Sequence, residues 1–276
     1  LIFLSGAECQ MGRPEDGRVM AIGSFFRIIN VGAVSEEEKK KIREALEEER
    51  VAGRISIYHG GIFGRGSFYD TDGYCPNMTR YAGNPVDPDQ LTAGEIFLRQ
   101  QAWKVLKICQ KVSPAFQRAR LMFAPQIGVR ESRRLVGLQE LTEKDILSGR
   151  KHQEAIARST YWIDIHCPLG RTKDKVHLCQ KGCSTTEPCA MLERYRDRLE
   201  ERLHPPEGDY YTIPSGCLIS ASRFNLLAAG RCVSANPKAL AAIRVMAPCM
   251  AMGQAAGVAA AVACQESKAA KDIPVQ

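Results

Sequence analysis

The stretch from Phe224 to Cys264 constrains the fold more than any other part of the chain. It opens with a short apolar run, Leu226 to Ala229, which has the length of a buried strand and ends at Gly230. From Val245 to Cys264 the sequence is uncharged and consists mostly of small residues, with Pro248 near the start of the expected helix. The pattern predicts a strand, a turn and a helix with so little side-chain bulk that a backbone or a flat cofactor can approach closely. The N–H groups at the start of such a helix suit an anion or an electron-rich ring.

Two segments of this stretch, NLLAAGRCVSA and IRVMAPCMAMGQAAGVAAA, resemble the C-terminal signature of the FAD-dependent oxidoreductase family with a glutathione-reductase-like FAD fold. Three further segments resemble the same family in the same order. These are GAECQMGRPEDGRVMAIGSFFRIINV near the start, GVRESRRLVGLQELTEKDILSG in the middle and STYWIDIH after it. The resemblance therefore spans nearly the whole chain.

The resemblance implies a mixed α/β fold, with α and β elements in two interleaved domains, and two-electron or hydride transfer through a bound FAD. Residues 1–20 and 216–276 are expected in the FAD-binding domain, and residues 21–215 in a substrate domain with a mixed sheet and flanking helices. The substrate is expected to be a small molecule. The contacts to FAD are expected from the turn and the small-residue helix: Gly230, Arg231, Ser234, Arg244, Met246, Gly253, Gln254 and Gly257.

The chain departs from the family in two places. The Gly-x-Gly-x-x-Gly turn that holds the ADP half of FAD has no counterpart, because the run from Gly60 to Gly66 has the wrong spacing and no helix-forming sequence behind it. We therefore expect an N-terminal FAD-binding segment to be supplied in cis or as a partner chain. The alternative is a non-catalytic fragment or subunit that no longer binds FAD by itself. Ser215, Gly216 and Cys217 also replace the Tyr-Arg-Ser that the family commonly has after its proline.

Three arginines and one glutamate within five residues make the segment from Gln126 to Gly137 a second candidate for chemistry. Charged groups between apolar residues require partners. One interpretation is a structural network of arginines with Glu131. The other is that Arg130 binds a substrate carboxylate or a flavin oxygen in the forked geometry that arginine favours. If the segment is extended, Arg130 and Arg134 share one face and Glu131 lies on the other.

The sequence from Tyr161 to His166 alternates like a strand, which would place Trp162, Asp164 and His166 on one face. A carboxylate beside an imidazole can orient the ring and raise its proton affinity. Asp164 and His166 are therefore candidates for proton transfer beside a flavin. The alternative is a structural histidine at the end of a strand.

The chain has 11 cysteines and no recognisable signal peptide, which favours free thiols in a reducing, cytoplasmic compartment. Four of them, Cys167, Cys179, Cys183 and Cys189, cluster near His177. Their spacing does not match the paired CxxC pattern of zinc sites. No metal is predicted, and a Cys-rich metal-binding module remains as an alternative function.

The net charge of +7 is modest for 276 residues, and basic residues alternate with acidic ones. This pattern argues against nucleic acid as a partner. The run from Val245 to Cys264 is long enough to span a membrane, but its Ala and Gly content makes it only weakly apolar, so no membrane span is predicted.

Periodicity predicts the remaining elements. Strands are expected over residues 21–31, 54–58, 119–124 and 209–214. Helices are expected from Ser35 and over residues 92–112, 142–147 and 188–204. Capping-box patterns at Ser35 with Glu38 and at Thr92 with Glu95 mark the starts of two of these helices.

Overall fold

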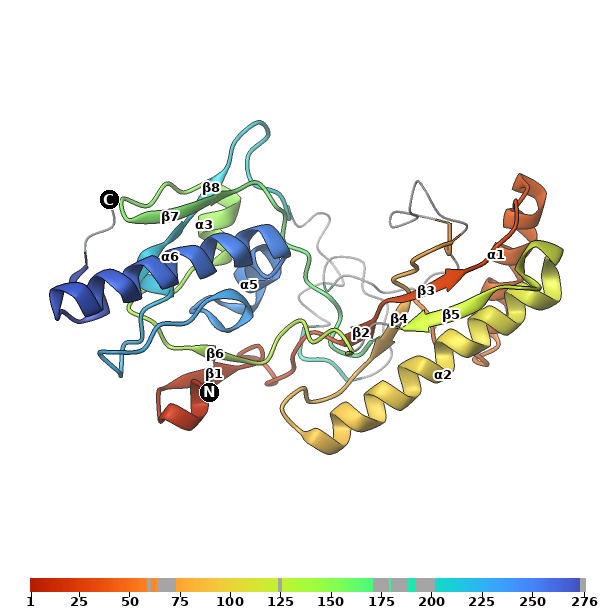
Figure 1. Cartoon of the computed structure of the whole chain (residues 1–276), viewed down its shortest axis with the longest axis horizontal. Coiled ribbons are helices and arrows are strands. Elements are labelled where there is room, and N and C mark those ends of the chain that lie inside the picture. The colour runs from red at the N-terminus through yellow and green to blue at the C-terminus, as the bar shows by residue number, and fades with distance from the viewer. Residues whose placement is uncertain are drawn as a thin grey trace. The chain divides into compact units, whose positions relative to one another are not determined.

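A computed structural model describes residues 1–58, 61–63, 73–123, 126–170, 179, 188–191 and 202–273. Helices are mixed with small antiparallel sheets, which confirms the α/β class (Figure 1). The chain divides into two compact units, residues 20–129 with 167–179, and residues 1–19 with 130–166 and 180–276. The second grouping includes residues that the sequence assigned to a substrate domain. The domain boundaries at 1–20, 21–215 and 216–276 stay a prediction.

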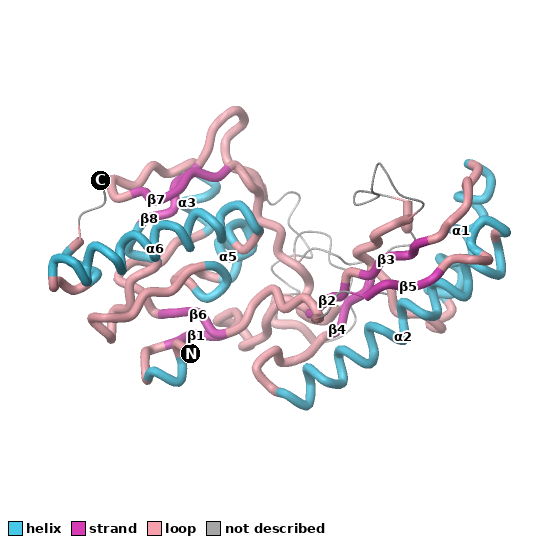
Figure 2. The backbone as a smooth tube through the Cα atoms, viewed as in Figure 1, coloured by secondary structure: helices cyan, strands magenta, loops and turns pink. Residues whose placement is uncertain are grey.

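The unit of residues 20–129 and 167–179 contains two long helices and two short strand pairs (Figure 2). Strands β2 (Ile22–Ser24) and β4 (Thr79–Tyr81) pair antiparallel, as do β3 (Phe26–Ile29) and β5 (Arg120–Phe123). Helices α1 (Glu36–Val51) and α2 (Pro88–Val112) pack against each other, and η2 (Pro114–Phe116) follows α2. Their apolar faces close over one core, whose largest fully buried side chains are Phe26, Phe116, Ile28, Ile42, Leu46, Ile57, Met78 and Leu106.

Local capping explains where these two helices begin. Ser35 and Glu38 form the predicted capping box at the start of α1. Helix α2 begins at Pro88, four residues before the predicted Thr92, because the Asp87 carboxylate accepts hydrogen bonds from the first backbone N–H groups. Thr92 instead donates its hydroxyl to the Pro88 carbonyl inside the helix.

The unit that holds both termini also has two two-stranded sheets. Strands β1 (Cys9–Met11) and β6 (Arg133–Leu135) pair antiparallel, as do β7 (Ala155–Ser159) and β8 (Tyr211–Pro214). The short elements of this unit are η1 (Phe3–Ser5), α3 (Glu143–Ser148), η3 (Ser215–Cys217), η4 (Gly230–Cys232), α5 (Pro237–Ile243) and η5 (Ala270–Asp272). Helix α6 (Met246–Glu266) is the predicted small-residue helix, and it packs beside the β7–β8 pair (Figure 1).

Helices α5 and α6 have opposite environments although both are rich in alanine. The last five residues of α5, Ala239 to Ile243, are buried. In α6 the buried residues are Pro248 and Met252, and Met246 and Met250 are 83% and 75% exposed. Helix α6 therefore presents an apolar surface to solvent.

Three predicted strands are wrong in detail. Residues 161–165 are irregular, and the strand of this region is β7, which the sequence analysis missed. Residues 226–229 and 54–58 form only isolated bridges, from Leu227 to Ile219 and from Ile57 to Thr79. The backbone of residues 161–165 bonds instead to scattered partners: Tyr161 accepts from the Tyr211 hydroxyl, and the Ile163 N–H donates to the Leu203 carbonyl. Most of the helix predicted over 188–204 lies outside the described residues.

Candidate functional site

The turn at Gly230 lies against the first turn of α6. Gly230 adopts a left-handed conformation with φ of +77°, which glycine tolerates better than other residues. A Cβ built on Gly230 would stand 3.7 Å from the Cys249 Sγ. The glycine therefore lets the chain reverse and bring Arg231 beside the start of the helix.

Arg244 stands at the junction of α5 and α6 and is tied to a distant segment. It is the C-terminal cap residue of α5 and precedes Met246 by two positions. Its guanidinium donates to the Asp164 carboxylate at 3.0 Å and to the Asp164 carbonyl at 2.8 Å. Burial lowers the pKa of Arg244, while Asp164 opposes that shift. The Nε–H of Arg244 has no hydrogen-bond partner within the part of the chain that the structure describes.

The two side chains predicted to form an acid–base pair do meet. The His166 Nε2 lies 3.4 Å from the Asp164 carboxylate, and His166 is only 3% exposed. Their meeting does not depend on the strand that suggested it, because residues 161–165 are irregular. Arg244, predicted as a cofactor contact, and Asp164 and His166, predicted as catalytic, therefore form one largely buried cluster.

The start of α6 is electrostatically positive. Val245, the N-cap residue, supplies no side-chain cap to the helix. The charges of Arg231 and Arg244 are close enough to influence each other, and Arg231 also acts on the Cys249 thiol, whose pKa burial raises. A helix N-terminus beside two arginines favours an anion.

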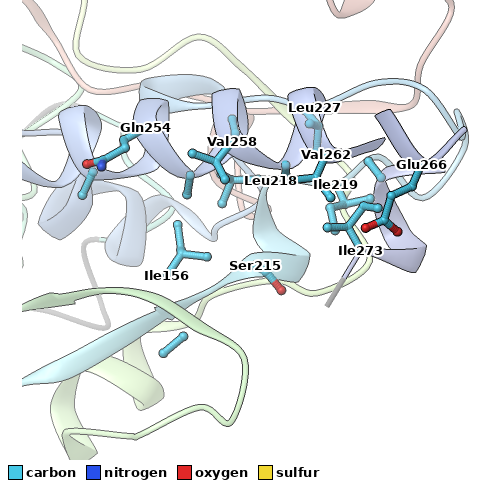
Figure 3. Close-up of a pocket in the computed structure, with 16 residues that line it drawn as sticks. Ile156, Ser215, Leu218, Ile219, Leu227, Gln254, Val258, Val262, Glu266 and Ile273 are labelled. Carbon is cyan, nitrogen blue, oxygen red and sulfur yellow. The ribbon is translucent and has the colours of Figure 1, made fainter. Parts of the chain in front are cut away.

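An apolar groove of about 600 Å³ runs along the other side of α6 (Figure 3). Gln254, Val258 and Val262 line it from the helix, while Ile156 and Ser215 come from the β7–β8 side. Gly253 and Gly257 lie on the solvent-exposed part of α6, where a Cβ would meet no atom within 4 Å.

The remaining predicted cofactor contacts lie apart from one another. Met246 is exposed at the first turn of α6. Ser234 is buried, and its backbone bonds to Cys217 and Leu141 inside the unit. The structure thus gathers Gly230, Arg231 and Arg244 at the helix start and distributes the others.

The arginine-rich segment forms a buried ion pair. Arg134 donates to the Glu131 carboxylate and, at 2.9 Å, to the Gly12 carbonyl, and both charged side chains are almost fully buried. The predicted division of faces is therefore wrong, because β6 begins only at Arg133 and the irregular residues before it bring Glu131 into contact with Arg134. The contact fits the structural interpretation for this pair. Arg130 is 8% exposed, and its assignment to substrate binding stays a prediction.

The described part of the chain holds its cysteines as free thiols. Ten free cysteines lie there, and these residues contain no group of three His, Cys, Asp or Glu side chains placed to hold a metal. Cys183 and His177 lie outside the described residues, so the four-cysteine segment is not tested as a whole.

By length and composition, helix α6 is long and apolar enough to cross a membrane, and 11% of its most apolar 18-residue segment is buried. No other helix in the described ranges is both long and apolar enough. The absence of a membrane span stays a prediction.

A positive helix start and a carboxylate–imidazole pair are features suited to an anionic cofactor and to proton transfer. The family model for FAD dependent oxidoreductases matches residues 1–276, the whole chain. The chain belongs to this family and is an FAD-dependent oxidoreductase. No curated protein and no solved structure matches it. The family, the enzymatic function and the FAD cofactor predicted from the sequence are confirmed, and neither a non-catalytic fragment nor a metal-binding module is favoured.

The residues at the start of α6 fit FAD. The left-handed turn at Gly230 leaves room beside the helix, and Arg231 and Arg244 suit an anionic group. Sequence reasoning missed that the Arg244 guanidinium binds the Asp164 carboxylate. A separation of 80 positions carries no periodic signal, so only the structure could reveal this contact.

Proposed function

We propose that FAD is bound at the start of α6 and that His166 and Asp164 handle the protons of the reaction. One observation carries this proposal: the 3.0 Å contact between Arg244 and Asp164 joins the expected cofactor residues to the expected acid–base pair. Arg244 lies two residues before the helix start and in direct contact with the carboxylate. Binding of FAD and proton transfer would thus take place in one neighbourhood.

The bound flavin supplies the two-electron chemistry. The Gly230 turn, Arg231 and the first turn of α6 bind and orient it, and their positive potential favours negative charge there. The His166 imidazole takes up or releases a proton at Nε2, and Asp164 keeps the ring oriented. The proposed site also includes the remaining predicted contacts, whose role is less direct: Ser234, Met246, Gly253, Gln254 and Gly257.

The substrate is proposed to be a small molecule. Arg130 would bind a carboxylate of that substrate, because a guanidinium offers a planar fork that matches carboxylate oxygens. The glutathione-reductase-like arrangement of the FAD-binding domain is part of the same proposal. A reducing, cytoplasmic location is supported by the ten free cysteines among the described residues.

An additional FAD-binding segment, in cis or as a partner chain, is proposed to complete the cofactor site. The sequence has no Gly-x-Gly-x-x-Gly turn for the pyrophosphate. The exposed apolar face of α6 and the groove beside it offer a surface that such a segment can cover. No nucleic acid and no membrane is proposed as a partner.

The role of His166 is tested by His166→Ala in FAD-loaded protein. Turnover is expected to fall on the order of a hundredfold while FAD stays bound, since general acid–base groups contribute about that much. His204→Ala is the matched control, because His204 is an exposed histidine stacked on Trp162. Stopped-flow absorbance of the flavin reports the rate. Normal turnover in His166→Ala would mean that His166 has a structural role and does not transfer protons.

The partner proposal is tested by mixing the 276-residue chain with a Gly-x-Gly-x-x-Gly segment from a family member. The chain alone is expected to be colourless, and the mixture is expected to bind FAD and turn yellow. Absorbance of the gel-filtration peak and FAD fluorescence quenching measure this. Tight binding of FAD by the chain alone would contradict the proposal.

A further inference from the structure

We propose that Arg244 is a positioning residue for the acid–base pair: it holds Asp164 in one orientation and lowers the proton affinity of His166 through the carboxylate oxygen that the two side chains share. This inference rests on the proposed function and deepens it. The sequence assigned Arg244 to the cofactor, and its contacts give it a task toward the pair that would transfer the proton.

One nitrogen of Arg244 bonds twice to the same residue. The Nη2 donates at 2.8 Å to the Asp164 backbone carbonyl and at 3.0 Å to the Asp164 Oδ2. A donor bound to both the backbone and the side chain of one residue fixes the side-chain rotation of that residue. The Arg244 side chain is itself only 11% exposed, and its backbone N–H donates to the Leu240 carbonyl at the end of α5. Asp164 therefore presents Oδ2 in one direction, although residues 161–165 form no strand.

His166 approaches the same oxygen. Its Nε2 lies 3.4 Å from the Asp164 Oδ2, and its side chain is almost fully buried. The Arg244 guanidinium stays charged throughout the physiological range, so it neutralises this carboxylate permanently. An imidazolium at His166 would meet a carboxylate that is already paired and a second cation beside it. The arrangement thus favours the neutral ring, the form that can accept a proton.

The other titratable groups around Arg244 act in the same direction or are neutral. Arg231, from η4, adds a positive charge close enough to act on Arg244. Burial raises the pKa of the Tyr161 phenol on the same segment as Asp164, and it also raises the pKa of the Cys249 thiol on α6. Both groups therefore stay uncharged over the range in which a histidine titrates.

A second cluster of the same three residue types offers an internal comparison. Arg150 donates to the Asp145 Oδ1 at 2.9 Å, and the His152 Nε2 lies 3.9 Å from that oxygen. The Arg150 side chain is 59% exposed, against 11% for Arg244. Because water screens an exposed charge, Arg150 should act on its histidine much less than Arg244 acts on His166.

Titration of the histidines tests the inference in the full chain without any flavin. Exchange of the imidazole C2 hydrogen is followed against pH by mass spectrometry of peptides, which gives the midpoint of each histidine. Arg244→Gln is expected to raise the midpoint of His166 by about one pH unit, because Asp164 then attracts the imidazolium alone. Arg244→Lys supplies one charged nitrogen with three donors, so its midpoint should stay near that of wild type. Arg150→Gln is the matched control and should leave the midpoint of His166 unchanged. An unchanged or lowered midpoint in Arg244→Gln, or an equal rise in Arg244→Lys, would overturn the proposal.

A measurement on the wild-type chain keeps the test decisive if Arg244→Gln does not fold. The ¹⁵N NMR signals of the Arg244 guanidinium, assigned by their loss in Arg244→Lys, are expected to shift with the midpoint found for His166. Protonation of the ring changes the charge at the oxygen that both groups contact, so signals that stay constant over this range would refute the coupling.

The positioning role is tested by the pH profile of flavin reduction in FAD-loaded Arg244→Gln. The profile is expected to move upward by the same amount as the His166 midpoint. Equal profiles in the variant and wild type would contradict positioning. If the midpoint shifts as expected but the chain does not bind FAD, the proposed function fails and the coupling between Arg244 and His166 stands.

Discussion

Gly230 and Gly253 were both predicted to touch the cofactor, and they differ in the backbone geometry that each supports. Gly230 needs a positive φ, and its neighbour Cys249 lies close by. Gly253 sits in the regular middle of α6, where a Cβ would point into open space. The same substitution should therefore have opposite effects on folding at the two positions.

Gly230→Ala is expected to lower the free energy of unfolding by about 1–2 kcal/mol, the cost of a side chain in the left-handed region. Gly253→Ala, the matched control, is expected to raise it by about 0.5–1 kcal/mol, because alanine loses less entropy in a helix. Urea denaturation followed by circular dichroism measures both. If the two substitutions had equal effects, a side chain at position 230 would not strain the turn.

At the scale of elements, His152 connects helix α3 to strand β8. Its Nδ1 lies 3.1 Å from the Thr212 Oγ1, and its Nε2 lies 3.9 Å from the Asp145 carboxylate. Asp145 caps α3 through Thr142 and also pairs with Arg150. Burial lowers the pKa of His152, Asp145 opposes the shift and Arg150 adds to it. The folded chain therefore keeps this histidine neutral more strongly than the unfolded chain does.

The stability of this unit is expected to decrease as the pH falls through 6.5, the ordinary histidine value, toward the lower folded-state pKa of His152. Above 6.5 both states carry a neutral ring, and the stabilising contribution is fully present. His152→Asn can keep a donor near Thr212 and cannot take up a proton, so its stability should depend less on pH. Urea midpoints between about pH 7.5 and 5 compare the two proteins. If the urea midpoints of wild type and His152→Asn changed with pH in the same way, His152 would not be the group responsible.

Elements whose signals are local were predictable from the sequence. The capping box at Ser35 located α1, and the low bulk after Val245 located α6, which begins at Met246. Segments whose backbone bonds to distant partners were not predictable. Residues 161–165 alternate like a strand, yet their backbone bonds reach residues far away in the sequence, as between Ile163 and Leu203 and between Tyr161 and Tyr211. The Asp164–His166 contact was predicted correctly, but the shared carboxylate with Arg244 could be found only in the folded chain.

At the scale of the whole molecule, the surface of α6 is the main feature that affects behaviour in solution. Val258 is 59% exposed and also lines the apolar groove beside Leu218 and Ile219. Large exposed apolar surfaces on soluble proteins favour association. The chain of 276 residues is therefore expected to bind a hydrophobic dye and to self-associate.

Val258→Glu is expected to reduce both dye fluorescence and self-association, because it places a charge in the middle of this surface. Glu48→Gln on α1, which changes charge at an exposed polar position, is the control and should leave both unchanged. Dye titration and sedimentation velocity give the two readouts. Dye binding that persists unaltered in the Val258 variant would place the responsible surface elsewhere on the molecule.

Arg244 donates two hydrogen bonds to Asp164, and this contact has a thermodynamic consequence. An anion that draws the guanidinium away from the carboxylate changes the proton affinity of the cluster, and linkage requires that protons change the affinity for the anion by the same factor. The affinity for the cofactor then depends on pH, and proton uptake depends on the cofactor. Both effects report the same coupling free energy. Calorimetric binding of FAD in buffers of different ionisation enthalpy would read that energy as a number of protons exchanged.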